Sequence, residues 1–285
     1  MKRLCILLNK HERIARSPYA DEGGEKKQMK AETRQIEKLW VHVYDTRAEL
    51  GAAAAANVAN RLRRIIQKKG EANVIFAAAP SQNELLACLL EADLDWTRVR
   101  AFHMDEYIGI SADNPACFGN YLDRAVFTKL SFMGRFYLRC DTENAKAKCD
   151  EYTLLLKKYP PDLVLLGIGE NGHLAFNDPA EADFNDPLTL KIVNLDETCR
   201  QQQVNDGCFA CIDDVPTQAL TMTMSCLMAV PEAVCVVPGS RKADAVYGAL
   251  LGPVNECCPA SILRRHGNAS LFLDRDSAAK VLKRW

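Results

Sequence analysis

The sequence lacks an excess of charge of either sign, because its 36 Lys and Arg residues meet 37 Asp and Glu residues and leave a formal net charge of -1 at pH 7. A balanced chain has no global basic field of the kind that nucleic-acid-binding proteins use. It also lacks any run close to the ~18 apolar residues that a membrane-spanning helix needs. Residues 74–79 and 163–168, two of its apolar stretches, have the length of β-strands. We therefore expect neither a nucleic acid nor a membrane as a partner.

A secretion signal and a metal motif are missing as well. The apolar stretch near the N-terminus covers only residues 4–8 and has no small-residue cleavage site, so we expect a cytoplasmic protein with reduced thiols. The twelve cysteines are scattered. Cys208 and Cys211 have the spacing of half a zinc site, but the only other close pair is Cys257 and Cys258, whose adjacent side chains suit one tetrahedral ion poorly. No metal site is predicted.

Hydrophobic periodicity predicts an alternation of strands and helices. Residues 1–38 are charged and irregular and are interpreted as an extension, which leaves residues 39–285 as a single catalytic domain. Thr46 and Glu49 form a capping box that starts a long helix, and Gly70 ends it. Strands are expected at 39–43, 74–79, 99–103, 163–168, 233–237 and 270–273, and further helices at 83–92, 145–158 and 241–250.

These strands are apolar on both faces, which implies that helices cover the sheet from both sides. The predicted fold class is therefore α/β, with a doubly wound, mainly parallel sheet. In such a sheet the substrate crevice lies at the carboxyl ends of the strands. Four segments follow predicted strands: 79–83 (Ala-Pro-Ser-Gln-Asn), 103–107 (His-Met-Asp-Glu-Tyr), 167–173 (Gly-Ile-Gly-Glu-Asn-Gly-His) and 238–242 (Pro-Gly-Ser-Arg-Lys). Together they suit an acid/base enzyme that acts on an anion.

Three ionisable side chains in these segments are candidates for chemistry. His173 follows a glycine-rich turn, and an imidazole with an ordinary pKa of ~6.5 can take and return a proton near neutrality. Asp105 and Glu106 are adjacent, so in an extended segment only one of them readily faces a given substrate. The alternative interpretations are a structural histidine and a solvated acidic turn.

Lys242 stands at a predicted helix start, where free amides already attract anions, and its ammonium suits a phosphate. Ser81, Gln82 and the amides of the next helix could hold the same phosphate. A solvated lysine and simple packing of residues 77–79 remain the alternatives.

Together the motifs resemble the glucosamine-6-phosphate deaminase (isomerase) family, part of the superfamily that also contains 6-phosphogluconolactonase. Residues 102–109 (Phe-His-Met-Asp-Glu-Tyr-Ile-Gly) are similar to the family's Met-Asp-Glu-Tyr segment, and residues 167–179 to its most diagnostic stretch. Residues 219–221 and 239–242 match two later blocks. A lactonase would instead be expected to carry Asp-Glu-Arg in the first segment and Ser-Leu-Phe-Pro after its Gly-His.

The resemblance implies isomerisation and deamination of a phosphorylated amino sugar of the glucosamine 6-phosphate type, without a cofactor. Asp105 would move a proton between C2 and C1, and His173 would assist ring opening. Asn171 and Asp178 occupy the positions of the two acidic residues that complete the family's triad. Asp178 is one methylene shorter than the usual glutamate, so either the backbone moves inward or a water bridges the gap to His173.

The resemblance also implies the substrate contacts, which we predict to be Ser81, Gln82, Glu106, Gly172 and Lys242. The family's Gly/Thr-rich phosphate loop is replaced by residues 79–83, in which Pro80 has no amide hydrogen to donate. Asn205 stands where the family places an arginine on the phosphate, and Arg200 or Arg241 could compensate.

Other functions stay open at this point. A lactonase or another sugar-phosphate isomerase is the alternative enzyme, and hydrolysis without ammonia release would identify a lactonase. A non-catalytic sugar-phosphate sensor is the alternative from another class, although residues 1–38 are too few and too irregular for a helix-turn-helix. Assembly into a homo-oligomer is also left open.

Overall fold

The computed structural model describes residues 31–285, whose strands form two sheets. The strands are β1 (Glu32–Ile36), β2 (Leu39–Tyr44), β3 (Ala72–Phe76), β4 (Val99–His103), β5 (Asp105–Tyr107), β6 (Gly134–Phe136), β7 (Leu163–Leu166), β8 (Leu190–Asn194), β9 (Gln218–Met222), β10 (Glu232–Val237) and β11 (Ala269–Asp274). The helices are α1 (Arg47–Lys69), α2 (Asn83–Leu90), α3 (Phe118–Leu122), α4 (Ala145–Lys158), α5 (Glu197–Asn205), α6 (Met224–Met228), α7 (Ala243–Leu251) and α8 (Ala279–Leu282).

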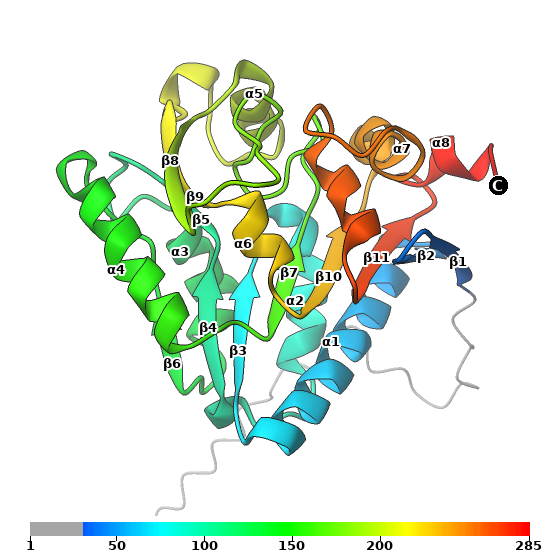
Figure 1. Ribbon diagram of the computed structural model, residues 1–285, viewed down its shortest axis with the longest axis horizontal. Helices are drawn as coiled ribbons and strands as arrows, with labels where there is room; N and C mark the ends of the chain where they lie inside the picture. Colours follow the sequence, from blue (N-terminus) through cyan, green and yellow to red (C-terminus); the bar gives the residue numbers. More distant parts are fainter. Residues whose placement is uncertain (1–30) are drawn as a thin grey trace, which may run out of the picture.

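The main sheet has eight strands in the order β1-β2-β11-β10-β7-β3-β4-β6 (Figure 1). All neighbouring strands in it pair in parallel except β1 and β2, which are antiparallel. Alternate side chains of its central strands enter two separate cores, so that Val164 packs into one and Leu165 into the other. The first core is completed by α4 and α7 and the second by α1 and α2, which confirms a mainly parallel sheet covered on both faces.

The ends of α1 follow the predicted capping chemistry. The hydroxyl of Thr46 accepts a hydrogen bond from the amide of Glu49, and the Glu49 carboxylate accepts one from the amide of Thr46. At the other end Gly70 adopts a left-handed conformation with φ of 85°. The strand over residues 99–103 and the helix over residues 145–158 also lie at their predicted positions.

The proposed boundary at residue 38 needs a correction, because Glu32–Ile36 form the edge strand β1. The exposed, polar residues of β1 concealed this strand from the hydrophobic pattern, and β1 joins the sheet through backbone hydrogen bonds to β2. The rest of the predicted extension, residues 1–30, lies outside the described residues.

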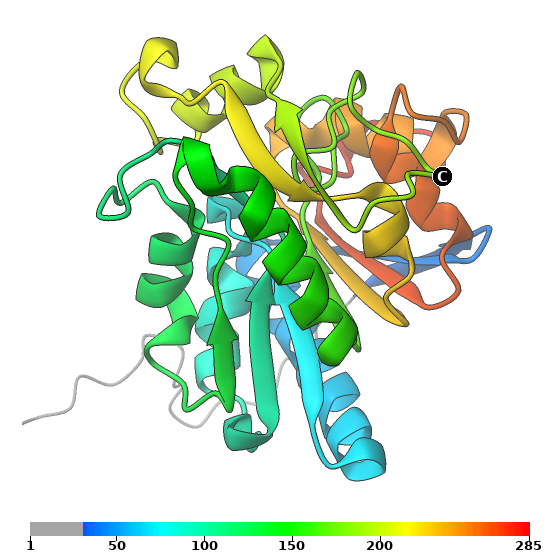
Figure 2. The same ribbon diagram turned by 60° about the vertical axis from the view of Figure 1, so that its left-hand side comes forward.

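A second sheet of three antiparallel strands, in the order β5-β9-β8, was not predicted. It lies beyond the carboxyl ends of β3 and β4, and Figure 2 shows it above α4 when that helix is turned forward. Its strands are short and β8 is only partly buried, so local hydrophobicity is a weak signal there. In residues 31–285 we find no helix with both the length and the apolar character that crossing a bilayer would take.

Candidate active site

A cavity opens at the carboxyl ends of the central strands. Its walls come from the segments after β3, β4 and β7, from α5, and from the turn before α7. The lining residues are Ala77, Ala78, Ala79, Ser81, Met104, Asp105, Phe118, Gly167, Ile168, Gly169, His173, Ala175, Phe176, Gln202, Gln203, Asp206 and Lys242. The structure thus brings Asp105 and His173, which are far apart in the sequence, into one cavity.

Asp105 is the first residue of β5 and pairs with Thr221 of β9. The residue is only 7% exposed. Burial, and secondarily the charge of Glu106, raise the pKa of Asp105 well above that of an ordinary aspartate. A buried carboxylate of raised pKa is a stronger base than a solvated one, which suits removal of a carbon-bound proton.

Glu106 points to the other side of β5, and its predicted contact with substrate is corrected. Its carboxylate accepts hydrogen bonds from the backbone amides of Tyr107 (3.1 Å), Phe118 (2.9 Å) and Gly119 (2.9 Å). Burial raises the pKa of Glu106, and these three amides act in the opposite direction. Glu106 therefore secures the start of α3 and does not line the cavity that holds Asp105.

Replacing Glu106 should affect stability more than substrate binding. Glu106→Gln places an amide N–H group against backbone donors, so the free energy of unfolding is expected to fall by about 1–3 kcal/mol. Chemical denaturation measures this change. Glu71→Gln is the matched control, because Glu71 lies at the surface, where an ion pair such as the one with Arg100 contributes at most about 1 kcal/mol. An unchanged unfolding free energy together with a raised KM would restore Glu106 as a substrate contact.

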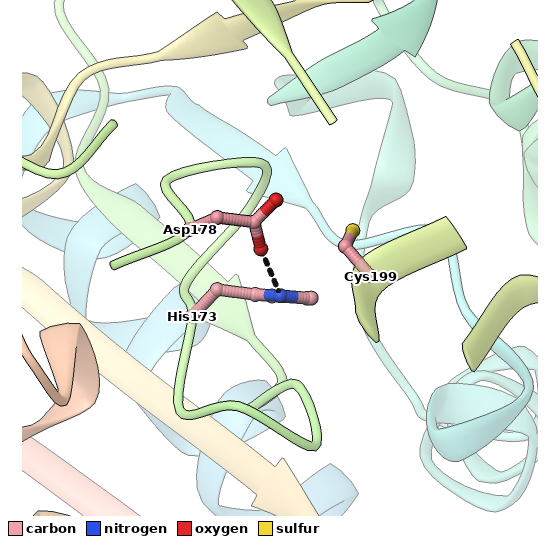
Figure 3. A group of neighbouring side chains, drawn as sticks. All are labelled: His173, Asp178 and Cys199. Atoms are coloured by element: carbon pink, nitrogen blue, oxygen red, sulfur yellow. Dashed lines mark hydrogen bonds and ion pairs between the residues drawn. The ribbon is translucent and has the colours of Figure 1, made fainter. Parts of the chain in front are cut away.

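His173 and Asp178 form a buried pair within one loop (Figure 3). The Nδ1 atom of His173 lies 2.8 Å from Oδ1 of Asp178, whose side chain is fully buried. Burial acts to raise the pKa of Asp178, but the hydrogen bond and charge of His173, with smaller contributions from Asn171 and the Asp196 amide, hold it below its ordinary value. The aspartate thus remains ionised and orients the imidazole.

The shorter side chain of Asp178 reaches His173 directly, so no bridging water is needed. The chain turns inward between them: Ala175 has a positive φ of 52°, and Leu174 forms a bridge with Asn177. The Asn177 side chain secures this turn by donating to the carbonyls of Leu174 (2.9 Å) and Met222 (2.8 Å). Of the two alternatives from the sequence, the direct contact of 2.8 Å agrees with a backbone that brings Asp178 close enough, without a bridging water.

Asn171 forms hydrogen bonds to both members of the His173–Asp178 pair and does not line the cavity. Its Nδ2 atom donates to Oδ1 of Asp178 (2.9 Å) and to Oδ2 of Asp196 (3.0 Å), while its Oδ1 accepts from the amide of His173 (3.1 Å). An asparagine can make this set of bonds because it offers both a donor and an acceptor. It acts as a positioning residue.

Two further predicted substrate contacts, Gln82 and Gly172, lie outside the cavity lining and make contacts within the protein. The Gln82 amide donates to the carbonyls of Val236 (3.2 Å) and Leu166 (3.4 Å), which ties together the ends of β10 and β7. Gly172 has φ of 87°, and its carbonyl accepts from the amide of Ala260 (2.8 Å). Neither residue lines the cavity.

Ser81 and Lys242 do line it, and their contact with a phosphate stays a prediction. Lys242 lies in the short turn before α7 and is largely buried. Burial lowers the pKa of Lys242, while the nearby carboxylates of Asp206 and Glu170 act in the opposite direction. No described residue forms an ion pair with the Lys242 ammonium, so the cavity holds a cation available to an anionic ligand.

Residues 45–272 match the family model described as glucosamine-6-phosphate isomerases/6-phosphogluconolactonase. The chain belongs to this family. Similar relatives are the glucosamine-6-phosphate deaminases of Listeria welshimeri, 35% identical over 74% of this chain and 88% of the relative, and Streptococcus pneumoniae, 33% identical over 73% and 86%.

Solved structures of the glucosamine-6-phosphate isomerase/6-phosphogluconolactonase family share the fold. A monomeric glucosamine-6-phosphate deaminase superimposes with a TM-score of 0.77 and 28% identity, over 84% of this chain and 98% of that one. The 6-phosphogluconolactonase of Trypanosoma brucei gives a TM-score of 0.69 over 88% of this chain and all of its own length. At 18% identity, the lactonase supports only the common fold.

The structure locates the two arginines that could replace the arginine that the family places on the phosphate. Arg200 donates to the carbonyls of Ile212 and Val215 and so does not replace the missing arginine. Arg241 pairs with Asp206 (2.9 Å) and Glu170 (3.4 Å) at the edge of the cavity.

Sequence reasoning missed the contribution of α5, which presents Gln202 and Gln203 to the cavity. Both are buried, as is Cys199 on the same helix. The signal that could have pointed to them is the spacing of α5, a helix of low hydrophobicity on which polar residues recur every three or four positions. The backbone amide of Glu170 donates to Oε1 of Gln202 (2.7 Å). The side-chain amide of Gln203, by contrast, makes no hydrogen bond to another described residue.

His173, Asp178 and Cys199 could in principle offer ligands to a metal, since their donor atoms lie within 4.8 Å of one another (Figure 3). Burial, followed by the charges of Asp178 and Asp196, raises the pKa of the Cys199 thiol well above its ordinary value. A metal binds the thiolate, and Nδ1 of His173 is already engaged with Asp178. The arrangement therefore favours a hydrogen-bonded network.

Proposed function

We propose that this protein isomerises and deaminates a phosphorylated amino sugar of the glucosamine 6-phosphate type, yielding a ketose phosphate and ammonia. The observation that carries the proposal is the convergence of Asp105, His173 and Lys242 on one cavity. The similarity to glucosamine-6-phosphate deaminases, at 35% identity over most of the chain, supports it.

Ring opening is assigned to His173. With Nδ1 donating to Asp178, Nε2 carries a lone pair, and it makes no hydrogen bond to a described residue. It can take the proton of the C1 hydroxyl group and return a proton to the ring oxygen, which converts the cyclic sugar to the open-chain aldehyde. Asp178 stabilises the imidazolium that forms in between.

Proton transfer between carbons is assigned to Asp105. Its carboxylate removes the proton from C2 of the open-chain sugar and the resulting acid returns it to C1, giving a C2 imine after tautomerisation. Addition of water to C2 and breakage of the C2–N bond then release ammonia and leave the ketose. The water-poor environment of Asp105, which is only 7% exposed, strengthens it as the base.

The phosphate is assigned to the end of the cavity that carries Ser81 and Lys242. The Lys242 ammonium supplies a positive charge in a largely buried position, where its attraction for a phosphate is less screened than at the surface. Because Lys242, Asp105 and His173 line the same cavity, a sugar whose phosphate binds at Lys242 is proposed to place C1 and C2 at Asp105 and His173.

Direct assay with several 2-amino-2-deoxy-hexose 6-phosphates tests this function. We expect release of both ammonia and ketose phosphate from at least one of them. Hydrolysis of 6-phosphogluconolactone without ammonia release would instead identify a lactonase, and interconversion of an aldose and a ketose phosphate without ammonia would identify another isomerase. Thermal stabilisation by a sugar phosphate without turnover would identify a sensor.

The cytoplasmic location and assembly into a homo-oligomer stay predictions. The solved deaminase with a TM-score of 0.77 is monomeric. Because the proposed acid, base and phosphate contacts all lie within one chain, the proposed reaction needs no second copy.

A further inference from the structure

We propose that Arg47, the first residue of α1, binds the anionic group of the substrate together with Lys242. The inference rests on the proposed function in taking that anion to be the phosphate of a sugar phosphate. A second cavity adjoins the first and shares Ser81, Asp206 and Lys242 with it. Its other lining residues include Arg47, Pro80, Asn205 and Arg241.

Arg47 reaches this place because α1 and α2 pack unusually closely. A Cβ atom on Gly51 would lie only 2.4 Å from Cβ of Glu84, so the absence of a side chain lets the two helices meet. Arg47 lies one turn before Gly51. Its Nε atom donates to Oε1 of Glu84 (2.6 Å), and its Nη2 atom donates to the carbonyl of Pro80 (2.6 Å).

These two contacts fix the guanidinium group of Arg47 and leave some of its N–H donors unused. An arginine has five N–H donors, and no described residue accepts a hydrogen bond from Nη1 of Arg47. The side chain remains 42% exposed. A guanidinium group already held by a carboxylate and a carbonyl loses little conformational entropy on binding an anion, and its planar fork matches phosphate geometry.

The loop of residues 79–83 offers few backbone donors to an anion, so a nearby cation would strengthen anion binding in this cavity. Pro80 has no amide hydrogen, so this loop offers one backbone donor fewer to an anion. Its carbonyl instead anchors Arg47, which places a positive charge beside Ser81. Asn205 is uncharged, and the guanidinium of Arg241 is already taken up by Asp206, Glu170 and the Asn205 carbonyl. Arg47 pairs with one carboxylate, that of Glu84, whereas Arg241 pairs with two, so the charge of Arg47 is less neutralised by its neighbours.

Comparison of Arg47→Met with Arg63→Met tests the inference. Arg63 lies on the same helix and donates to the carbonyl of Asp93, away from both cavities. With glucosamine 6-phosphate, Arg47→Met is expected to raise KM about 10–100-fold and to change kcat by less than about threefold, because a charge-assisted contact to the non-reacting end is lost. Arg63→Met should leave both constants unchanged.

Binding of inorganic phosphate separates this inference from the proposed function. Isothermal titration should show about 10-fold or greater weakening in Arg47→Met, partial recovery in Arg47→Lys, and wild-type affinity in Arg63→Met. Wild-type phosphate affinity in a folded Arg47→Met variant would overturn the role of Arg47. Phosphate binding that depends on Arg47 in a protein without deaminase activity would overturn the proposed function alone. If Arg47→Met unfolds, Arg47→Gln takes its place in the same titration, because glutamine removes the charge while its amide can still donate a hydrogen bond.

Discussion

Asp105→Asn is expected to lower kcat for glucosamine 6-phosphate by about 10²–10⁴-fold, the range usual for the loss of a general base. The carboxamide has nearly the same shape as the carboxylate, but it cannot accept a proton from C2. Because Asp105 lines the cavity without any side-chain hydrogen bond to a described residue, the substitution should leave the surrounding structure intact. Steady-state release of ammonia measures the effect.

The pH dependence of the wild-type enzyme gives an independent check on Asp105. Burial raises its pKa above the ordinary value of 3.8, so the active carboxylate is present at higher pH and is lost as the pH falls through the raised pKa. An acidic decline of activity that sets in above pH 3.8 is expected, and it should be missing from the residual activity of Asp105→Asn. A variant with wild-type kcat would remove Asp105 from the mechanism.

His173→Gln is expected to lower kcat by a similar factor of about 10²–10⁴, because glutamine can neither take nor return a proton near neutrality. The effect should be largest with the cyclic sugar phosphate, since the imidazole is assigned to ring opening. Rapid-quench measurement of open-chain intermediates would show that none accumulates in the variant, whereas they should accumulate in Asp105→Asn.

Cys199→Ala is the matched control for His173→Gln. Cys199 is buried beside the same Asp178 carboxylate, yet it does not line the cavity. Its loss should reduce kcat by less than about 10-fold and lower the stability, because a buried side chain is truncated. Equal losses in Cys199→Ala and His173→Gln would mean that the assay reports disruption of the pair and not ring opening by the imidazole.

Much of the framework was predictable from local pattern. The alternation of buried strands and helices indicated the sheet, and the capping residues Thr46 and Gly70 located both ends of α1. Since parallel strands align their carboxyl ends, the segments that carry Asp105 and His173 could be expected to meet. The strands β8 and β9 escaped prediction because they are short and because β9 pairs with β5, which lies far away in the chain.

The orientation of individual side chains could not be predicted in the same way. Neighbours on a strand face opposite sides, so the pattern indicated that Asp105 and Glu106 diverge but not which of them faces the cavity. The amides of Phe118 and Gly119 settle this by binding Glu106. A local sequence pattern does not contain that information, because α3 is brought to β5 by the fold.

The sequence by itself determined the strand and helix pattern, the loop that joins His173 to Asp178, and the kinds of side chain available at the ends of the strands. Only the tertiary structure decided that Gln82 ties together two strands of the sheet and that Arg47 lines a cavity together with Ser81 and Lys242. The physical reason is that a polar group binds whichever donors and acceptors surround it. For Gln82 and Arg47 these come from Val236 and Glu84, which lie 154 and 37 positions away in the chain.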